Sequence, residues 1–326
     1  MNEIPVTEIR NIRIGQTEDI NAGTGCTVFI SENGMKAGID IRGGGPASRE
    51  AALLDPLMAA DTIHGIVLSG GSAFGLDAAG GVMKYLEERN IGFDVGITRV
   101  PLVVQSDIFD LTVGDHKVRP DKAMGYEAAR IAMEEPNYRD GNYGAGTGAT
   151  AGKCMGMDRC TKTGIGSYAV RLDDLEVGAV VVVNALGDVY DWKTGQCIAG
   201  LLNEDKTGFE CSPQLIREGI SIVRDRLVQN TTLGVVITNA HFGKPSLCKI
   251  AGMAHDGYAR SIRPVHTSFD GDSIYAVSVG DIKADMDVVG TIAAEVMSEA
   301  IIKAVRSAVS AYGHPASGDI LHSDLR

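Results

Sequence analysis

Apolar residues along this chain fall into short continuous runs that alternate with longer helical repeats. The strongest run is Leu175–Asn184, which contains four consecutive valines from Val180 and predicts a buried β-strand. An Asn-Gly turn signal at 33–34 separates two further strand-like runs and predicts a β-hairpin of Cys26–Ser31 with Lys36–Arg42. Shorter apolar runs predict strands at Gly65–Ser69, Thr232–Thr238 and Ser273–Val279.

Helical periodicity, bounded by start and stop residues, occupies much of the remaining chain. It predicts helices at Leu76–Arg89, Ala123–Glu134, Pro213–Val228, Pro245–Ile262 and Val288–Ala311. The third of these is expected to begin with Ser212 as N-cap and Pro213 in the first turn. No break in composition divides the elements, so we expect one domain over residues 1–326, of class α+β, with sheets covered by helices.

Composition narrows the class of protein. Hydrophobic residues make up 44% and charged residues 22%, which is typical of a globular chain. The 41 glycines and the low aromatic content of 5% indicate an aliphatic core in which backbones approach closely through Gly and Ala. A net charge of −12 disfavours nucleic acid or an anionic membrane as partner, since both attract basic surfaces.

The sequence also bears on location and cofactors. No apolar stretch approaches the ~20 residues of a membrane span, and the N-terminus lacks the basic and apolar regions of a signal peptide. Six cysteines without a CxxC pair favour reduced thiols, and we therefore expect a cytoplasmic protein. The seven histidines show no metal-binding spacing, so neither a metal nor another cofactor is expected.

Two glycine-rich segments carry candidate chemistry. In Ser69–Gly75 a strand is followed by a helix, and free backbone N–H groups there could hold an anion or an oxyanion; a tight, purely structural turn is the alternative. Gly70, Gly71 and Ser72 are expected to line a substrate pocket. The segment Gly141–Lys153 lacks the spacing of a phosphate-binding loop, so we interpret it as a ligand-lining loop that delivers Lys153 to a site.

A third constellation lies in the C-terminal third. Asn230, Thr231 and Thr232 stand at the start of a buried strand, and a Thr released by cleavage could act as an N-terminal nucleophile whose own α-amine is the base. Asp270 and Asp272, separated by one glycine, could orient that nucleophile or bind a substrate ammonium. Both segments also have ordinary interpretations, as an unused glycosylation sequon and as turn residues.

Taken together, seven segments in one order resemble the β-aminopeptidase and L-aminopeptidase/D-esterase family, which includes the nylon-oligomer hydrolases. They cover most of the chain: Arg42–Glu50, Leu68–Leu76, Arg119–Ala123, Ala149–Lys153, Val180–Asn184, Asn230–Thr238 and Ile262–Asp272. The resemblance implies a four-layer α-β-β-α sandwich like that of N-terminal nucleophile hydrolases. It also implies a self-cleaved chain of 1–230 and 231–326, a homo-oligomer of αβ units, and a small peptide or amide as substrate.

The same resemblance assigns roles to residues. Thr231 is the implied nucleophile, and Asn230–Thr231 is the implied self-cleaved bond. Lys153 and Asn184 line the site, and Asp270 and Asp272 match acidic positions beside the nucleophile. The chain departs from the family at Phe109, where members often have an active-site Tyr. Two alternatives to an aminopeptidase stay open: an endo-type amidase on linear amides, and an unprocessed, non-catalytic binding protein.

Overall fold

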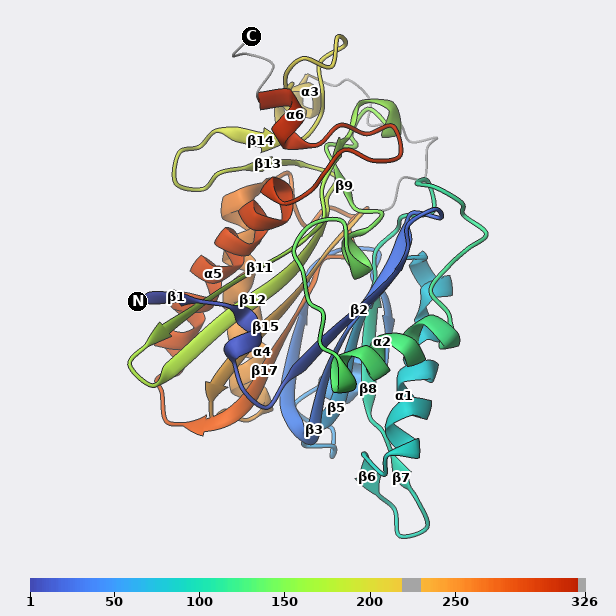
Figure 1. Cartoon of the computed structure of the whole chain (residues 1–326). Helices are drawn as coiled ribbons and strands as arrows, with labels where there is room; N and C mark the ends of the chain where they lie inside the picture. Colours follow the sequence, from blue (N-terminus) through green and yellow to red (C-terminus); the bar gives the residue numbers. More distant parts are fainter. Residues whose placement is uncertain (219–229, 322–326) are drawn as a thin grey trace.

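A computed structural model of the chain describes residues 1–218 and 230–321, and a twisted sheet runs through the whole molecule (Figure 1). Its strand order is β1-β11-β12-β15-β17-β3-β5-β8-β4, with β2 paired to β3. The strands are β1 (Asn2–Ile4), β2 (Arg13–Asp19), β3 (Thr24–Ile41), β4 (Ala47–Arg49), β5 (Ile63–Ser69), β8 (Val103–Asp107), β11 (Ile165–Leu172), β12 (Leu175–Asn184), β15 (Thr231–Ala240) and β17 (Ser273–Ile282).

Smaller strands and helices complete the described part of the chain. The minor strands are β6 (Phe93–Asp94) with β7 (Arg99–Val100), β9 (Thr150–Ala151) with β10 (Thr161–Lys162), and β14 (Cys197–Ala199), β13 (Asp188–Tyr190) and β16 (Ile262–Arg263). The α-helices are α1 (Ala78–Glu88), α2 (Lys122–Glu134), α3 (Ser212–Arg217), α4 (Lys244–Ser261), α5 (Met286–Arg306) and α6 (Ser317–Leu321).

The predicted hairpin around Asn33-Gly34 is wrong. The two runs form one long strand, β3, whose first half pairs with β2 and β5 and whose second half pairs with β17. At the junction the register shifts between Ile30 and Met35, and Gly34 takes a φ of 78°. The glycine therefore supports a bulge that bends the strand from one layer into the next, a use of positive φ that local sequence cannot distinguish from a turn.

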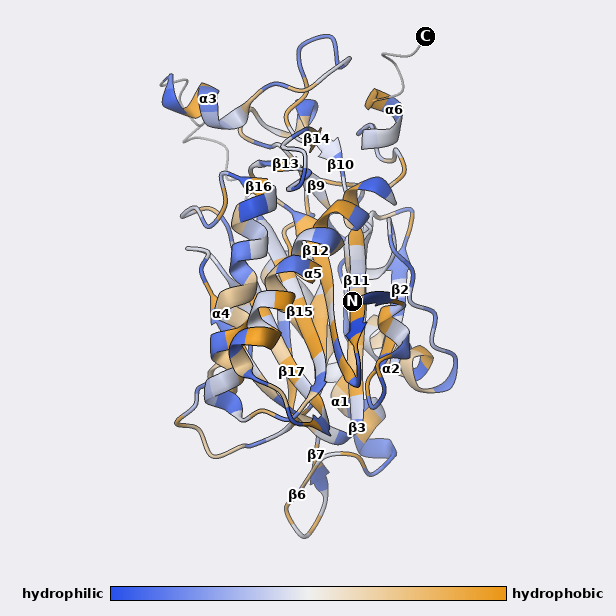
Figure 2. Cartoon of the chain, turned by 90° about the vertical axis from the view of Figure 1, so that its left-hand side faces the viewer, coloured by the Kyte–Doolittle hydropathy of each residue, from blue (hydrophilic) through white to orange (hydrophobic). Residues whose placement is uncertain are grey.

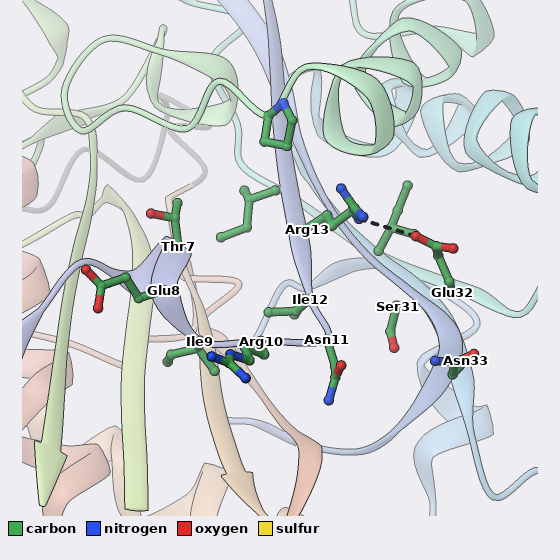
Figure 3. A pocket seen from close by; sticks show the side chains of 13 residues that line it. Thr7, Glu8, Ile9, Arg10, Asn11, Ile12, Arg13, Ser31, Glu32 and Asn33 are labelled. Atoms are coloured by element: carbon green, nitrogen blue, oxygen red, sulfur yellow. Dashed lines mark ion pairs between the residues drawn. The ribbon is translucent and has the colours of Figure 1, made fainter. Parts of the chain in front are cut away.

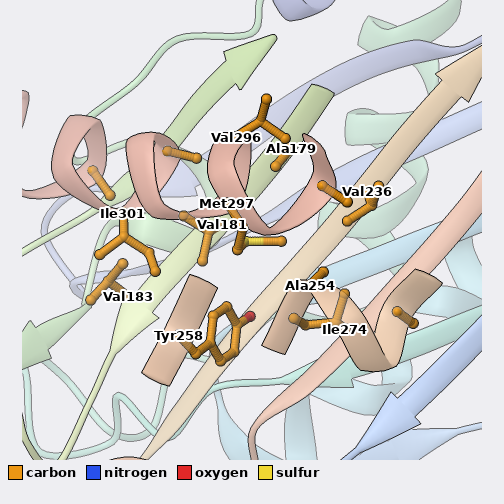
Figure 4. Packing of buried hydrophobic residues seen from close by; sticks show 14 of the residues in the cluster. Ala179, Val181, Val183, Val236, Ala254, Tyr258, Ile274, Val296, Met297 and Ile301 are labelled. Carbon is orange, nitrogen blue, oxygen red and sulfur yellow. The ribbon is translucent and has the colours of Figure 1, made fainter. Parts of the chain in front are cut away.

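The sheet folds into two facing layers because β3 belongs to both. One apolar cluster lies between the layers and joins Phe29, Ile66 and Leu68 of one to Val182 and Val235 of the other. A second cluster packs α4 and α5 on the outer face of the layer containing β12 and β15, as Figure 4 shows in detail. A third packs α1 and α2 on the opposite outer face. The predicted α-β-β-α order is thus confirmed, and Figure 1 shows the four layers from the side.

The central strands are apolar almost throughout, whereas polar residues gather on the outer helix faces and at the loop ends (Figure 2). Predicted helix limits agree with the structure for α1, α2 and α4 within a few residues. Helix α5 ends at Arg306, five residues before the predicted end. Helix α3 has Cys211 as N-cap, and Ser212 instead donates its hydroxyl to Asp188 at 2.6 Å. The rest of the predicted Pro213–Val228 helix, from residue 219, lies outside the described residues.

Candidate active site

The predicted scissile pair lies at the start of β15, in the buried centre of the molecule. Thr231 is only 3% exposed, and its hydroxyl donates to the carbonyl oxygen of Asn230. The Asn230 carbonyl also accepts the N–H of Gly271 at 2.7 Å, while the N–H of Asn230 donates to the carbonyl of Phe269 at 3.1 Å. Pairing with the 269–271 segment therefore fixes the peptide group that joins Asn230 to Thr231.

Asn184 and Lys153 lie on the other side of this strand start. Asn184 ends β12 and is the register partner of Thr231 in the antiparallel β12–β15 pair. Its Oδ1 accepts the Lys153 ammonium at 2.6 Å, and its Nδ2 donates to the carbonyl of Phe109 at 3.0 Å. Burial lowers the pKa of Lys153 to about 8, against the opposing effect of nearby groups that include Asp270 and Asp110. A fraction of the amine is therefore neutral near pH 7.

The two predicted carboxylates are buried and differ in their partners. Asp270 accepts the N–H and the hydroxyl of Thr267 at 2.8 and 2.6 Å, and burial together with the charge of Asp272 raises its pKa to about 6. Asp272 accepts the N–H of Thr232 at 2.8 Å through one oxygen. Its other oxygen accepts the N–H of His266 at 3.0 Å and the His266 Nδ1 at 2.9 Å. Asp272 thus binds the residue that follows Thr231.

In the glycine turn after β5, the fold itself uses three backbone N–H groups. The N–H of Gly70 donates to the Gly25 carbonyl at 3.0 Å, that of Gly71 to Asp110 at 2.7 Å, and that of Ser72 to the Ile108 carbonyl at 2.9 Å. These three groups are therefore not free to hold an oxyanion, because the fold already uses them. The tight structural turn is the better interpretation; a role for these residues and for half-buried Phe109 in lining a pocket stays a prediction.

The structure thus brings Thr231, Asn184, Lys153, Asp270 and Asp272 to one place from four separate segments, and it adds groups that sequence reasoning missed. These are the backbone N–H of Gly271, the side chain of His266, and Asp110, whose pKa burial raises to about 6. A backbone donor leaves no signal in residue types. His266 lies within Ile262–Asp272, one of the segments that resemble the family, and Asp110 directly follows Phe109. Neither residue has a spacing that indicates its partners.

A groove of about 410 Å³ lies elsewhere, between the segments 7–14 and 30–33, and holds the Arg13–Glu32 ion pair (Figure 3). It shares no residue with the cluster around Thr231. Within residues 1–218 and 230–321, His, Cys, Asp and Glu side chains form no group of three suited to a metal ion. Nor is any helix of this part of the chain both long and apolar enough to cross a membrane.

Comparison with known proteins matches residues 4–317 to peptidase family S58. An uncharacterized aminopeptidase of Mycobacterium leprae is 35% identical over 340 residues, which is 95% of this chain and 92% of the relative. A 6-aminohexanoate-oligomer endohydrolase of a Kocuria species is 31% identical over 312 residues, covering 90% of this chain and 84% of the relative.

A solved structure, that of the L-aminopeptidase D-Ala-esterase/amidase of Ochrobactrum anthropi, superposes with a TM-score of 0.71 at 15% identity. The match covers 98% of this chain and 93% of that one, and that protein has a variant of the Ntn-hydrolase fold. At this identity the likeness concerns the fold. It agrees with the four layers seen here, and the family resemblance predicted from sequence is confirmed.

Proposed function

We propose, on the premise that this chain belongs to peptidase family S58 and is an amide-bond hydrolase, that it cuts itself before Thr231 and then uses Thr231 as its nucleophile. The substrates would be small peptides or amides, cleaved through an acyl-enzyme without a cofactor. One observation carries this proposal: the Thr231 hydroxyl hydrogen-bonds the carbonyl of the bond that would be cut, and that carbonyl is held by a backbone N–H.

Self-cleavage needs only groups that are present at this peptide. The Thr231 Oγ1 would attack the Asn230 carbonyl carbon, the C–N bond would break, and the hydroxyl proton would pass to the departing amine. Water would then hydrolyse the resulting ester to a carboxylate on Asn230 and a free Thr231. The Gly271 N–H, 2.7 Å from the carbonyl oxygen, is placed to stabilise the negative charge that forms there during attack.

Burial supports this order of events. Thr231 is 3% exposed and Asn184 is fully buried, so in the uncut chain an external amide has no access to the hydroxyl. Cleavage would release the α-amine of Thr231, and such an amine, with an ordinary pKa of about 7.7–8.0, can serve as the base for its own hydroxyl. The proposal therefore makes cutting a condition for activity on substrates.

The residues around Thr231 suit the hydrolysis of a substrate amide after self-cleavage. Asn184 Nδ2 carries two hydrogens, of which the contact with Phe109 uses one, so it can also donate to a substrate oxyanion. Lys153 adds positive charge beside it. Asp270 and Asp272 would fix the start of β15 and set the proton of the new α-amine, as the sequence predicts. If one of them instead binds a substrate amine, its Asn variant should lose free-amine substrates more than N-acylated ones, mainly through KM.

The choice between an aminopeptidase and an endo-type amidase rests on the substrate. Relatives named for each activity align over nine-tenths or more of this chain. We favour the aminopeptidase, because the relative named for that activity is the more similar of the two, at 35% against 31% identity. Hydrolysis of free-amine dipeptides but not of N-acylated linear amides would support this choice, and the reverse would favour the endo-type amidase. Oligomeric state and cytoplasmic location stay predictions.

The test of self-cleavage is direct. Purified wild-type protein should contain fragments of 1–230 and 231–326 by intact mass, with Thr231 at the new N-terminus. Thr231→Ala should remain one chain and lack amidase activity, whereas Thr232→Ala, the neighbouring control, should be cut and active. An uncut wild-type chain that is fully active would refute the proposal. A fragment beginning at Thr232 would move the nucleophile by one residue.

A further inference from the structure

We propose that His266 is a positioning residue that holds Asp272 against the start of β15 and so sets the attack geometry of Thr231. This inference rests on the proposed function, because it needs Thr231 as the nucleophile. His266 has no assigned role in the reaction above, and it lies four residues before Asp270 in the sequence.

The two carboxylate oxygens of Asp272 bind two different segments. One carboxylate oxygen accepts two donors from His266, the backbone N–H at 3.0 Å and Nδ1 at 2.9 Å. The other oxygen accepts the Thr232 N–H at 2.8 Å. Asp272 itself is 1% exposed, so water does not compete for these oxygens. The carboxylate therefore transmits the position of His266 to the backbone immediately after the nucleophile.

The imidazole is constrained to serve as a donor toward Asp272. A carboxylate accepts, so Nδ1 carries the proton in this contact. The opposite nitrogen, Nε2, is buried without a hydrogen-bond partner among the described residues. The ring is also packed edge-on against His255, with centroids 4.7 Å apart. The proton on Nδ1 and the orientation of the ring are thus both fixed.

The backbone points to a built feature as well. His266 has a φ of 59°, in the left-handed region that costs an ordinary L-residue about 1–2 kcal/mol. This conformation allows the backbone N–H and the side chain of one residue to reach the same carboxylate oxygen. Asn and Gly are the residues that best tolerate it. A matched pair of variants is therefore available that keeps the backbone conformation and differs in the side-chain donor.

The experiment compares His266→Gly, which removes the donor, with His266→Asn, which supplies an amide N–H near the position of Nδ1. The readouts are the rate of self-cleavage of newly synthesised chain, and kcat and KM with an aminoacyl p-nitroanilide as probe. We expect His266→Gly to lower the rate of self-cleavage and the kcat for the probe by about 10²-fold each, because a small misplacement of the nucleophile reduces rates by that factor. The KM for the probe should change less than about twofold. His266→Asn should recover most of the loss.

Controls separate this effect from general instability. His64→Ala removes another buried histidine, which accepts the Leu102 N–H at 3.3 Å outside the site, and should lower the melting temperature without changing kcat. If His266→Gly does not fold, His266→Ala takes its place, since it also lacks the side-chain donor. Equal rates in the donor and non-donor variants would overturn the inference.

The two proposals fail in different ways. If Thr231→Ala is inactive while His266→Gly matches wild type, the nucleophile stands and the role of His266 does not. If Thr231→Ala is cut and active, the proposed function fails and this inference with it.

Discussion

At the scale of single residues, the sequence indicated those parts of the site whose chemistry lies in side chains close together along the chain. The sequence pattern makes Asp270 and Asp272 candidates because one glycine separates them, and it makes Asn230–Thr232 candidates because they stand just before an apolar run. The choice of Thr231 as nucleophile comes from the family resemblance. Gly271 supplies its backbone N–H, which any residue other than proline would have, so no residue type reveals it. The converse holds for the backbone N–H groups of Gly70, Gly71 and Ser72. They are not available to a ligand, because they already donate hydrogen bonds within the fold.

Asn184 provides the first prediction at this scale. Asn184→Ala should reduce turnover by about 10²–10³-fold, the usual cost of losing one oxyanion donor. Steady-state kinetics on protein shown to be cut will measure it. Asn184→Asp is the matched comparison, because it keeps an oxygen for Lys153, 2.6 Å away, but loses the donor. If Asn184→Asp retains wild-type turnover, the role of Asn184 is only to hold Lys153.

At the scale of elements, the sequence located most strands and helices but not how they connect in space. The Asn-Gly signal in β3 predicts a hairpin, whereas β3 continues through it and bends from one layer to the other. Glycines explain the close fit of helices on strands. A Cβ on Gly15, Gly38 or Gly166 would lie within 2.4 Å of backbone atoms of α2, α4 or α5. The predicted close approach of backbones through Gly is confirmed at these contacts.

This packing gives a prediction for the α5–β11 contact. A Cβ on Gly166 would lie 2.2 Å from the Ala304 nitrogen and 2.4 Å from the Ala300 carbonyl oxygen, and helix backbone cannot yield as a flexible side chain does. Gly166→Ala should therefore lower the free energy of unfolding by about 1–3 kcal/mol or more. Gly318→Ala, where nothing lies within 4 Å, is the control and should be neutral or slightly stabilising. Denaturant unfolding of both variants would measure these changes in the free energy of unfolding. Equal unfolding midpoints for the two variants would contradict the packing argument.

At the scale of the whole molecule, resemblance predicted the four layers, whereas periodicity alone predicted only sheets covered by helices. The structure adds a feature that neither indicated, a fully buried lysine, Lys162. Lys162 donates to the carbonyl of Ala149 at 3.0 Å, to that of Gly146 at 3.2 Å and to that of Thr163. It thereby fixes the glycine-rich loop that carries Lys153. Sequence reasoning treats lysine as a surface residue, so only the tertiary structure could reveal this cation in the interior.

Burial lowers the pKa of Lys162 to about 7, although nearby Cys160 and Asp110 oppose the shift. In the unfolded chain the same ammonium titrates near its ordinary value of about 10.4. Between these two values the unfolded state binds a proton that the folded state has released. Lys162 therefore contributes a rise in the free energy of unfolding with pH across this window, of up to about 1.4 kcal/mol per pH unit.

The last prediction isolates that contribution. The free energy of unfolding should be measured by chemical unfolding from pH 6 to pH 10 for two proteins that both carry Thr231→Ala, so that every chain is uncut. One keeps Lys162, and is called wild type below, and the other carries Lys162→Met. Below pH 7 the difference between the two should be constant. As pH rises from 7 toward 10, the wild type should gain stability relative to Lys162→Met, since the methionine has no proton to release. Lys249→Met is the matched control, because Lys249 is exposed and water solvates its ammonium in both states. For Lys249→Met, the free energy of unfolding plotted against pH should stay parallel to that of wild type. If the plot for Lys162→Met is parallel as well, the Lys162 ammonium keeps its proton inside the fold and the prediction is wrong.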